Sequence, residues 1–228
     1  SILEISPSDA FRPEQKNQPP EEKISPPEQG QYLYVYGITD NKDITLDLKG
    51  LQDAPLTKIN FNDLTILFSF YPVLHPLIEE KEVLLHAEIL NKIAEKTTII
   101  PMAFGTVFKD QEILEVVLEK SYHQAKKTFE LIKDKMELGI KVIKKDEVSE
   151  AARLEILEEF NKLSVKSAAG GKFSERLLLN HSFLVERDKF TQFSDKVGEL
   201  EEKHQKVKFL YTGPYPAYSF VDINIKVG

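Results

Sequence analysis

Cysteine is absent from all 228 residues. A chain without thiols cannot form disulfides, thiolate zinc sites or iron–sulfur clusters, and it has no cysteine nucleophile. The missing disulfides are also compatible with a reducing cytosol. The sequence therefore excludes the disulfide-stapled secreted class and every class of site that depends on cysteine thiolate ligation.

An excess of positive charge is also lacking, because 37 acidic and 30 basic residues give a net charge of −7. Nucleic-acid binding normally needs a basic surface that displaces counterions, and the chain as a whole offers none. One basic stretch, Lys141, Lys144 and Lys145, alternates with Val142 and Ile143. We interpret it as the solvated face of a strand, so we expect no nucleic-acid partner.

Long apolar runs are missing as well. No segment approaches the roughly 18 apolar residues that a membrane-spanning helix needs, and the N-terminus carries no basic-then-apolar signal pattern. We therefore expect a soluble, cytoplasmic protein without a membrane-lipid partner. Its hydrophobic content of 41% is sufficient for real cores, and the length suits two small domains or one large one.

Motifs that carry catalysis are not found. The ten glycines form neither a phosphate-binding loop nor a nucleophile elbow. The acidic clusters at 79–82 and 199–202 fit charged helix faces better than acid/base pairs. No two of the histidines have the i, i+4 spacing of a helical metal pair; they are His75, His86, His123, His181 and His204. We expect no enzyme, no cofactor and no metal site.

Residues 1–31 differ from the rest of the chain. They hold six of the twelve prolines among Glu, Gln, Lys and Ser. Proline lacks a backbone donor and restricts the residue before it, which disfavours helices and central strands. We expect an extended proline-rich tail that is attached to the folded part through its few apolar side chains, Ile2, Leu3, Ile5 and Phe11.

An α+β domain is predicted for residues 32–133. Alternating apolar patterns predict strands at 32–36 and 64–70, with a less regular stretch between them, and a short strand at 98–101. A helix is expected at 80–96, with an inward stripe of Leu84, Ala87, Leu90 and Ala94. A second helix is expected at 110–133, and its inward residues are Leu114, Leu118, Tyr122, Ala125, Phe129 and Ile132.

A modified ferredoxin-like domain is predicted for residues 134–228. Strands are expected at 137–145, 177–186, 207–212 and 219–227, and helices at 147–163 and 188–204, the second capped by Asp188. Small residues at 167–171, ending in Gly170 and Gly171, predict a mobile joint or a shortened loop between strand-bearing units. Strands that alternate with helices in this way favour a sheet covered by helices on one face.

The segment Thr212–Val221 (TGPYPAYSFV) is the best candidate for a functional site. Gly213 suits a positive φ, and two prolines around a tyrosine favour a rigid bend between two strands. Aromatic residues on such a bend either cover the sheet edge, which we consider the simpler interpretation, or anchor a partner protein. The candidate partner-binding residues are Pro214, Tyr215, Pro216, Tyr218 and Phe220.

Four motifs occur in the order and spacing of one known family. They are YLYVYGI at 32–38, PMAFGTVF at 101–108, NHSFLV at 180–185 and TGPYPAYSFV at 212–221. Together they resemble the gas vesicle protein F/L (GvpF/GvpL) family from Tyr32 onward, and His86 is similar to a histidine often found in the family's first helix. The chain departs from the family in its proline-rich tail and in a shorter stretch before Leu177.

The resemblance implies an accessory protein of gas vesicles, either an assembly or nucleation factor or a minor shell-associated component. Its expected partners are the major shell protein and other accessory proteins. From the fold alone, a ligand-sensing module is the alternative, since ferredoxin-like domains often bind metabolites at their edges. A hydrolase is a distant third possibility, because nucleophile and base are missing.

Overall fold

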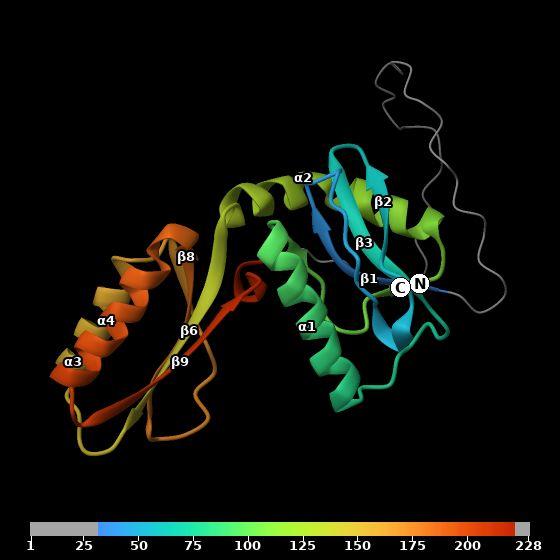
Figure 1. Ribbon diagram of the computed structural model, residues 1–228. Coiled ribbons are helices and arrows are strands. Elements are labelled where there is room, and N and C mark those ends of the chain that lie inside the picture. Colours follow the sequence, from blue (N-terminus) through green and yellow to red (C-terminus); the bar gives the residue numbers. More distant parts are fainter. Residues whose placement is uncertain (1–31, 222–228) are drawn as a thin grey trace.

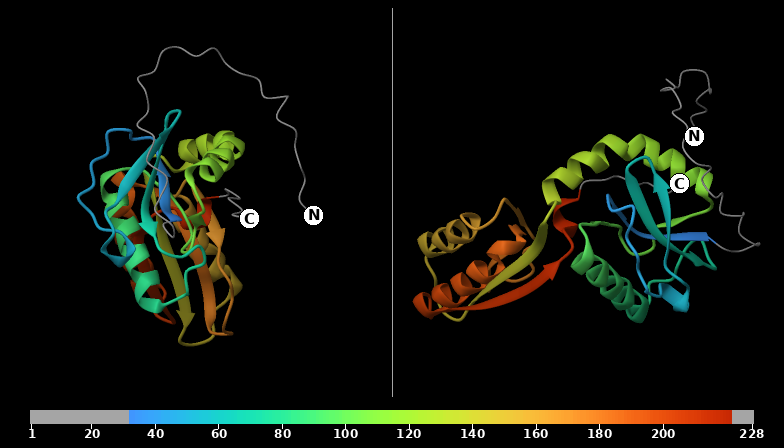
Figure 2. Two further views of the ribbon diagram at one scale, coloured as in Figure 1. Left: turned by 90° about the vertical axis from the view of Figure 1, so that its right-hand side faces the viewer. Right: turned by 45° about the horizontal axis from the view of Figure 1, so that its top comes forward.

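A computed structural model describes residues 32–221 of the chain and shows an α+β fold with two antiparallel sheets (Figure 1). The expected tail at 1–31 lies outside the described residues. The two sheets lie end to end along the molecule (Figure 2). We call them the N-terminal sheet and the C-terminal sheet.

The N-terminal sheet contains five strands: β1 (Tyr32–Thr39), β2 (Thr57–Phe61), β3 (Leu64–Tyr71), β4 (Ile100–Pro101) and β5 (Val107–Phe108). Their order is β2-β3-β1-β4, and β5 pairs with another part of β1. The period-two alternation of β1 sends Leu33 and Val35 to one face and Tyr34 and Tyr36 to the other, and both faces are buried. The strands predicted at 32–36 and 64–70 are confirmed, whereas β2 and β5 were not predicted.

Two helices cover opposite faces of this sheet: α1 (Glu80–Lys96) and α2 (Gln111–Ile132). The predicted inward stripe of α2 is buried except for Tyr122, which is half-buried. Asp110 caps α2, because its Oδ1 accepts a hydrogen bond of 2.9 Å from the backbone N–H of Ile113.

The predicted stripe of α1 is wrong at Leu84, whose side chain is 63% exposed. The buried face of α1 is instead centred on His86, Leu90 and Ile93. At 100° per residue, Leu84 lies almost opposite this face. Because His86 is a polar residue type that the fold buries, the apolar pattern alone does not mark this face.

The C-terminal sheet is built from β6 (Lys135–Lys144), β7 (Lys166–Ala169), β8 (Leu177–Glu186) and β9 (Val207–Tyr215), in the order β7-β8-β6-β9. Helix α3 (Glu150–Asn161) follows β6, and α4 (Phe190–Lys203) follows β8. The succession β-α-β-β-α-β in this order is the ferredoxin-like arrangement. Both helices pack on one face of the sheet (Figure 1), over a core that includes Phe160, Phe183 and Phe193.

The joint or shortened loop predicted at 167–171 is wrong for its first three residues, which form a strand. Ser167 to Ala169 belong to edge strand β7, where they pair with Phe183, Ser182 and His181 of β8. The backbone N–H of Gly170 extends the pairing with a 2.8 Å bond to the carbonyl of Asn180. Small side chains suggested flexibility, but an edge strand is held by backbone hydrogen bonds that need no large side chain.

Two further predictions about the C-terminal part are wrong. Asp188 does not cap α4; it lies in the 3-10 turn Arg187–Lys189 that precedes the helix, and no side chain caps α4. The start of the strand expected at 219–227 is a 3-10 turn, Tyr218–Phe220, and its remainder beyond 221 lies outside the described residues. In α4, the preceding 3-10 turn satisfies the first helical amide, because the N–H of Phe190 donates to the carbonyl of Arg187.

The junction between the two sheets lies where α2 ends at Ile132 and β6 begins at Lys135. The backbone N–H of Asp134 donates to Thr98 Oγ1 at 3.2 Å, and Arg187 Nη2 donates to the carbonyl of Ala94 at 2.6 Å. The division of the chain into domains at residue 133 stays a prediction, which the change of sheet at this point supports.

Candidate functional site

The C-terminal bend, residues 212–221, lies at the junction between the two sheets. Strand β9 continues through Tyr215, which pairs with Glu137 of β6. Gly213 has a φ of +106°, and a Cβ at this position would lie 2.7 Å from the carbonyl oxygen of Glu137. The expectation of a positive φ at Gly213 is confirmed, and both constraints exclude a larger residue there.

A buried carboxylate fixes the bend. Both oxygens of Glu137 accept from Ser219: the backbone N–H donates to Oε2 at 2.7 Å, and the hydroxyl donates to Oε1 at 2.7 Å. The hydroxyl oxygen of Ser219 also lies 3.1 Å from that of Ser182 on β8. Because burying an unpaired carboxylate is costly, the position of Ser219 is tightly coupled to that of Glu137.

The five candidate residues of the bend divide into two groups. Pro216 and Phe220 are buried, and Phe220 packs into the cluster between the N-terminal sheet and α2. Pro214 is exposed, and the side chains of Tyr215 and Tyr218 are each 40% exposed. The first group thus makes contacts within the chain, while the second group is available to a partner.

The phenol of Tyr218 stays protonated at neutral pH. Partial burial, and then the nearby Glu137 carboxylate, raise its pKa to about 12. The neutral hydroxyl can both donate and accept a hydrogen bond. Tyr218 therefore presents an apolar ring with a polar tip, a combination that is frequent at protein interfaces.

A second group of polar side chains lies in the core beneath α1. The Nε2 of His86 lies 3.0 Å from the carbonyl oxygen of Met102, and its Nδ1 lies 2.9 Å from the hydroxyl of Tyr34. Since a carbonyl only accepts, Nε2 carries the hydrogen and Nδ1 accepts from Tyr34. The backbone N–H of Gly105 in turn donates to the Tyr34 oxygen at 3.1 Å.

The hydroxyl of Tyr36 is bonded in a similar way. It lies 2.9 Å from Ser69 Oγ and accepts from the backbone N–H of Leu51 at 2.8 Å. Gly50 allows this approach, because a Cβ there would lie 2.4 Å from the hydroxyl oxygen. Burial raises the pKa values of Tyr34 and Tyr36 and lowers that of His86, so all three are neutral.

These buried groups have every polar atom paired and no contact with solvent, so we assign them to structure and not to chemistry. Two of the sequence motifs, at 32–38 and 101–108, meet at His86. Each motif and the histidine can be recognised in the sequence, but the contact between them cannot. The recurrence of tyrosines at every second position of β1 was the available indication, because buried tyrosines require partners.

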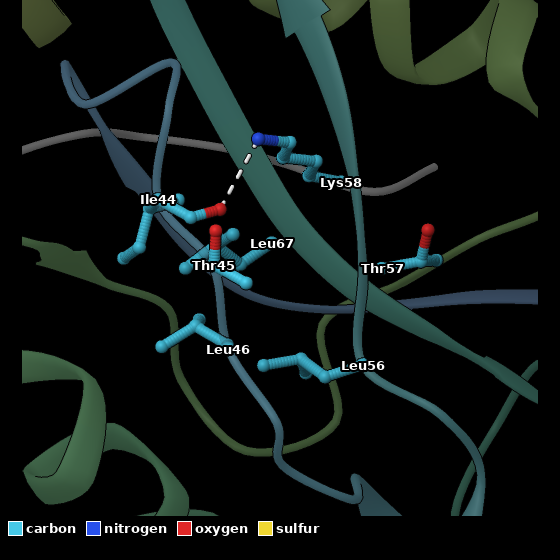
Figure 3. A pocket seen from close by; sticks show the side chains of 7 residues that line it. All are labelled: Ile44, Thr45, Leu46, Leu56, Thr57, Lys58 and Leu67. Atoms are coloured by element: carbon cyan, nitrogen blue, oxygen red, sulfur yellow. Dashed lines mark hydrogen bonds between the residues drawn. The ribbon is translucent and has the colours of Figure 1, made fainter.

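The N-terminal sheet carries a surface pocket of about 300 Å³ (Figure 3). Its lining residues are Ile44, Thr45, Leu46, Leu56, Thr57, Lys58 and Leu67. The ammonium of Lys58 is already engaged, because it donates to the carbonyls of Lys42 at 2.6 Å and Ile44 at 3.1 Å. The pocket presents polar and apolar surface in similar amounts, and it does not belong to the ferredoxin-like sheet.

Within residues 32–221, no group of three histidine, aspartate or glutamate side chains is placed to hold a metal ion. In the same range, no helix is both long and apolar enough to cross a membrane.

The fold and the bend define an α+β protein in which a helix-covered sheet is joined to a ferredoxin-like unit through a clasp, formed by the Glu137–Ser219 hydrogen bonds and the buried Phe220. The model of the gas vesicle synthesis protein GvpL/GvpF family matches residues 32–156 and 144–222. The chain belongs to this family, which confirms the resemblance of the four motifs. Its role is therefore connected with gas vesicles.

Relatives and solved structures agree with this assignment. Gas vesicle protein F of Haloferax mediterranei is 31% identical over 85% of this chain and 94% of its own length. Gas vesicle protein F1 of Halobacterium salinarum is 28% identical with the same coverage. The crystal structure of GvpF from Anabaena sp. PCC7120 has a TM-score of 0.75 at 18% identity, covering 85% of this chain and 99% of that one, so it shows a common fold.

Proposed function

We propose that this protein is a cytoplasmic gas vesicle accessory protein that binds the major shell protein, as an assembly or nucleation factor or a minor shell-associated component. Family membership supports this role. A shell subunit with an apolar surface must be kept from aggregating until it is added to the wall. Soluble proteins can do this by covering that surface with exposed aromatic side chains or a free sheet edge.

The observation that carries the proposal is the pair Tyr215 and Tyr218 on a bend that is already rigid. Each ring is 40% exposed, although the backbone between them is anchored by the buried residues Pro216 and Ala217. A partner that binds there does not have to order a loop, so less of the binding energy is lost. Next to them, β9 is an edge strand of the C-terminal sheet.

We expect Tyr215→Ala to fold with a melting temperature close to that of the wild type and to lose shell-protein binding. Truncation of an interface anchor typically costs about 2 kcal/mol or more, which is roughly a 30-fold loss of affinity. Affinity for purified shell protein and vesicle formation in a host strain measure the effect. The same substitution at Tyr218 tests the second ring.

Leu154→Ala is the matched control, because Leu154 is an exposed apolar residue on α3, away from the bend. It should leave binding unchanged. If Tyr215→Ala lowers the melting temperature while vesicles still form, the bend serves only the architecture of this chain and the binding surface lies elsewhere.

We further expect binding of the shell protein to need neither a metal ion nor a nucleotide. The motivation is that the described residues offer no metal-binding cluster and that the sequence has no phosphate-binding loop. A pull-down of purified components in EDTA tests this. Binding that disappears with the chelator would refute it.

The alternative function, a ligand-sensing module, is favoured only by the pocket beside β2 and β3. Its volume is at the lower end for small-molecule sites. A metabolite that binds the native state would raise the melting temperature with its concentration. Thermal stabilisation that is abolished by Leu56→Trp, which would fill the pocket, would support this alternative.

A further inference from the structure

The C-terminal sheet has one face without helices, and only half of that face is covered. Helices α3 and α4 pack on the opposite face. At the end near the junction, Leu184 and Ala168 pack against the N-terminal core, and Ser182 bonds Ser219. At the far end, the neighbouring residues Asn180, Lys141 and Leu210 form a row across β8, β6 and β9 that this packing does not cover.

This uncovered half is basic and apolar. Lys141, Lys208 and Leu210 are exposed on it. The ring of Phe173, 72% exposed, lies 5.7 Å from Lys141 Nζ, and its loop is held by a 2.8 Å bond from Asn180 Nδ2 to the carbonyl of Gly171. We call Lys141, Phe173, Lys208 and Leu210 the basic face. It is notable in a chain whose net charge is −7.

An exposed surface that is apolar and acidic lies between β3 and α1. Leu77 and Ile78 are 76% and 86% exposed, and Val73 and Leu84 are also exposed. Glu79 and Glu80 follow directly and are exposed, and neither forms an ion pair with another described residue. We call residues 73–84 the acidic segment, because its three glutamates outnumber its one lysine, the exposed Lys81. Large exposed apolar groups of this kind mark interaction sites.

We infer that the acidic segment of one copy docks on the basic face of a second copy. The argument is complementarity: each surface combines exposed apolar side chains with charged groups, and the net charges of the two surfaces are of opposite sign. Both surfaces are exposed within one chain, so the acidic segment of a copy does not cover the basic face of the same copy. The basic face also continues the sheet surface on which the N-terminal core of the same chain already packs.

Such a contact joins two different surfaces, so it is heterologous. Each copy keeps one unused surface, and association proceeds head to tail into chains or rings instead of stopping at a symmetric dimer. Burial of Leu77 and Ile78 supplies most of the affinity, because solvent-exposed ion pairs contribute little. The glutamates and lysines set the orientation, and raised salt weakens the contact moderately.

The experiment is sedimentation of the full chain from about 1 to about 300 µM, a range that detects micromolar association. We expect the average mass to rise with concentration beyond that of a dimer. Ile78→Asp and Lys141→Glu should each weaken association at least about tenfold, and both positions are exposed, so the variants should fold. Circular dichroism checks this.

A mixture of the two variants gives the sharpest result. The Ile78→Asp copy retains its basic face and the Lys141→Glu copy retains its acidic segment, so the mixture should form pairs and nothing larger. A symmetric contact through either surface cannot produce this outcome. Leu154→Asp, an equally drastic change on α3, should associate like the wild type.

A monomer at every concentration, or association that neither variant weakens, would overturn the inference. Pairing that fails in the mixture although each variant is folded would overturn it too. Self-association does not depend on the proposed contact with shell protein, and the two are separated by a pull-down. Tyr215→Ala should lose shell protein and still self-associate, whereas Ile78→Asp should do the reverse.

Discussion

Replacing Phe220 by alanine is expected to lower the free energy of unfolding by about 3 to 5 kcal/mol. The side chain is 5% exposed and packs in the cluster formed by the N-terminal sheet and α2, although it follows β9 of the C-terminal sheet. Truncating a buried phenylalanine removes its transfer free energy and leaves a cavity. Chemical denaturation of wild type and variant measures the difference.

The lost stability should mainly weaken the connection between the two sheets. With Phe220 removed, we expect backbone amides at 217–221 to exchange faster, and the unfolding transition to broaden or divide as the two parts become less coupled. Phe173→Ala is the matched control, because that ring is 72% exposed, and it should change stability by less than about 0.5 kcal/mol. If Phe220→Ala and Phe173→Ala lowered the free energy of unfolding equally, Phe220 would not connect the two sheets as described.

Most helices and strands could be predicted from periodicity, because the burial of one face dominates local structure. The limits of β8, Leu177–Glu186, are those that the sequence predicts. Among the described residues, the missed strands β2, β5 and β7 each pair with one neighbouring strand only. An edge strand is held by hydrogen bonds to one neighbour and can have a weak apolar pattern, as Lys166–Ala169 has, so its own residues carry little information.

The candidate site was predicted only in part. The rigid bend and the positive φ of Gly213 follow from residue types, because glycine and proline restrict the backbone directly. That Phe220 points into the core while Tyr215 and Tyr218 stay exposed depends on Glu137, which lies 82 residues before its partner Ser219. Such a long-range bond leaves no periodic trace in one sequence.

The burial of His86 in the core is also determined by contacts that the sequence does not reveal. A histidine between Leu85 and Ala87 is usually assigned to the surface, yet here it is buried, and it bonds Tyr34 and the carbonyl of Met102. We expect His86→Ala to cost about 3 kcal/mol or more at pH 8. Each buried group that loses its partner costs about 1 to 3 kcal/mol, and the cavity adds to this.

Stability should also depend on pH through His86. Burial lowers the pKa of His86 in the folded state below its ordinary value of 6.5, so the unfolded chain binds a proton more readily than the folded chain. The contribution of this residue is therefore complete above pH 6.5 and is lost as the pH falls below it. At pH 5.5 the loss reaches up to about 1.4 kcal/mol for one histidine that stays neutral in the folded state.

The measurement is urea unfolding at pH 8 and pH 5.5 for wild type, His86→Gln and His181→Gln. Burial also lowers the pKa of His181, so the wild type should lose stability through both residues. His86→Gln should be less stable than the wild type at pH 8, but its stability should fall less between the two values. The contrary result is that His86→Gln keeps the full wild-type decrease in stability while His181→Gln reduces it. His86 would then be protonated in the folded state at pH 5.5, and its assigned pairing with the carbonyl of Met102 and the hydroxyl of Tyr34 would be wrong.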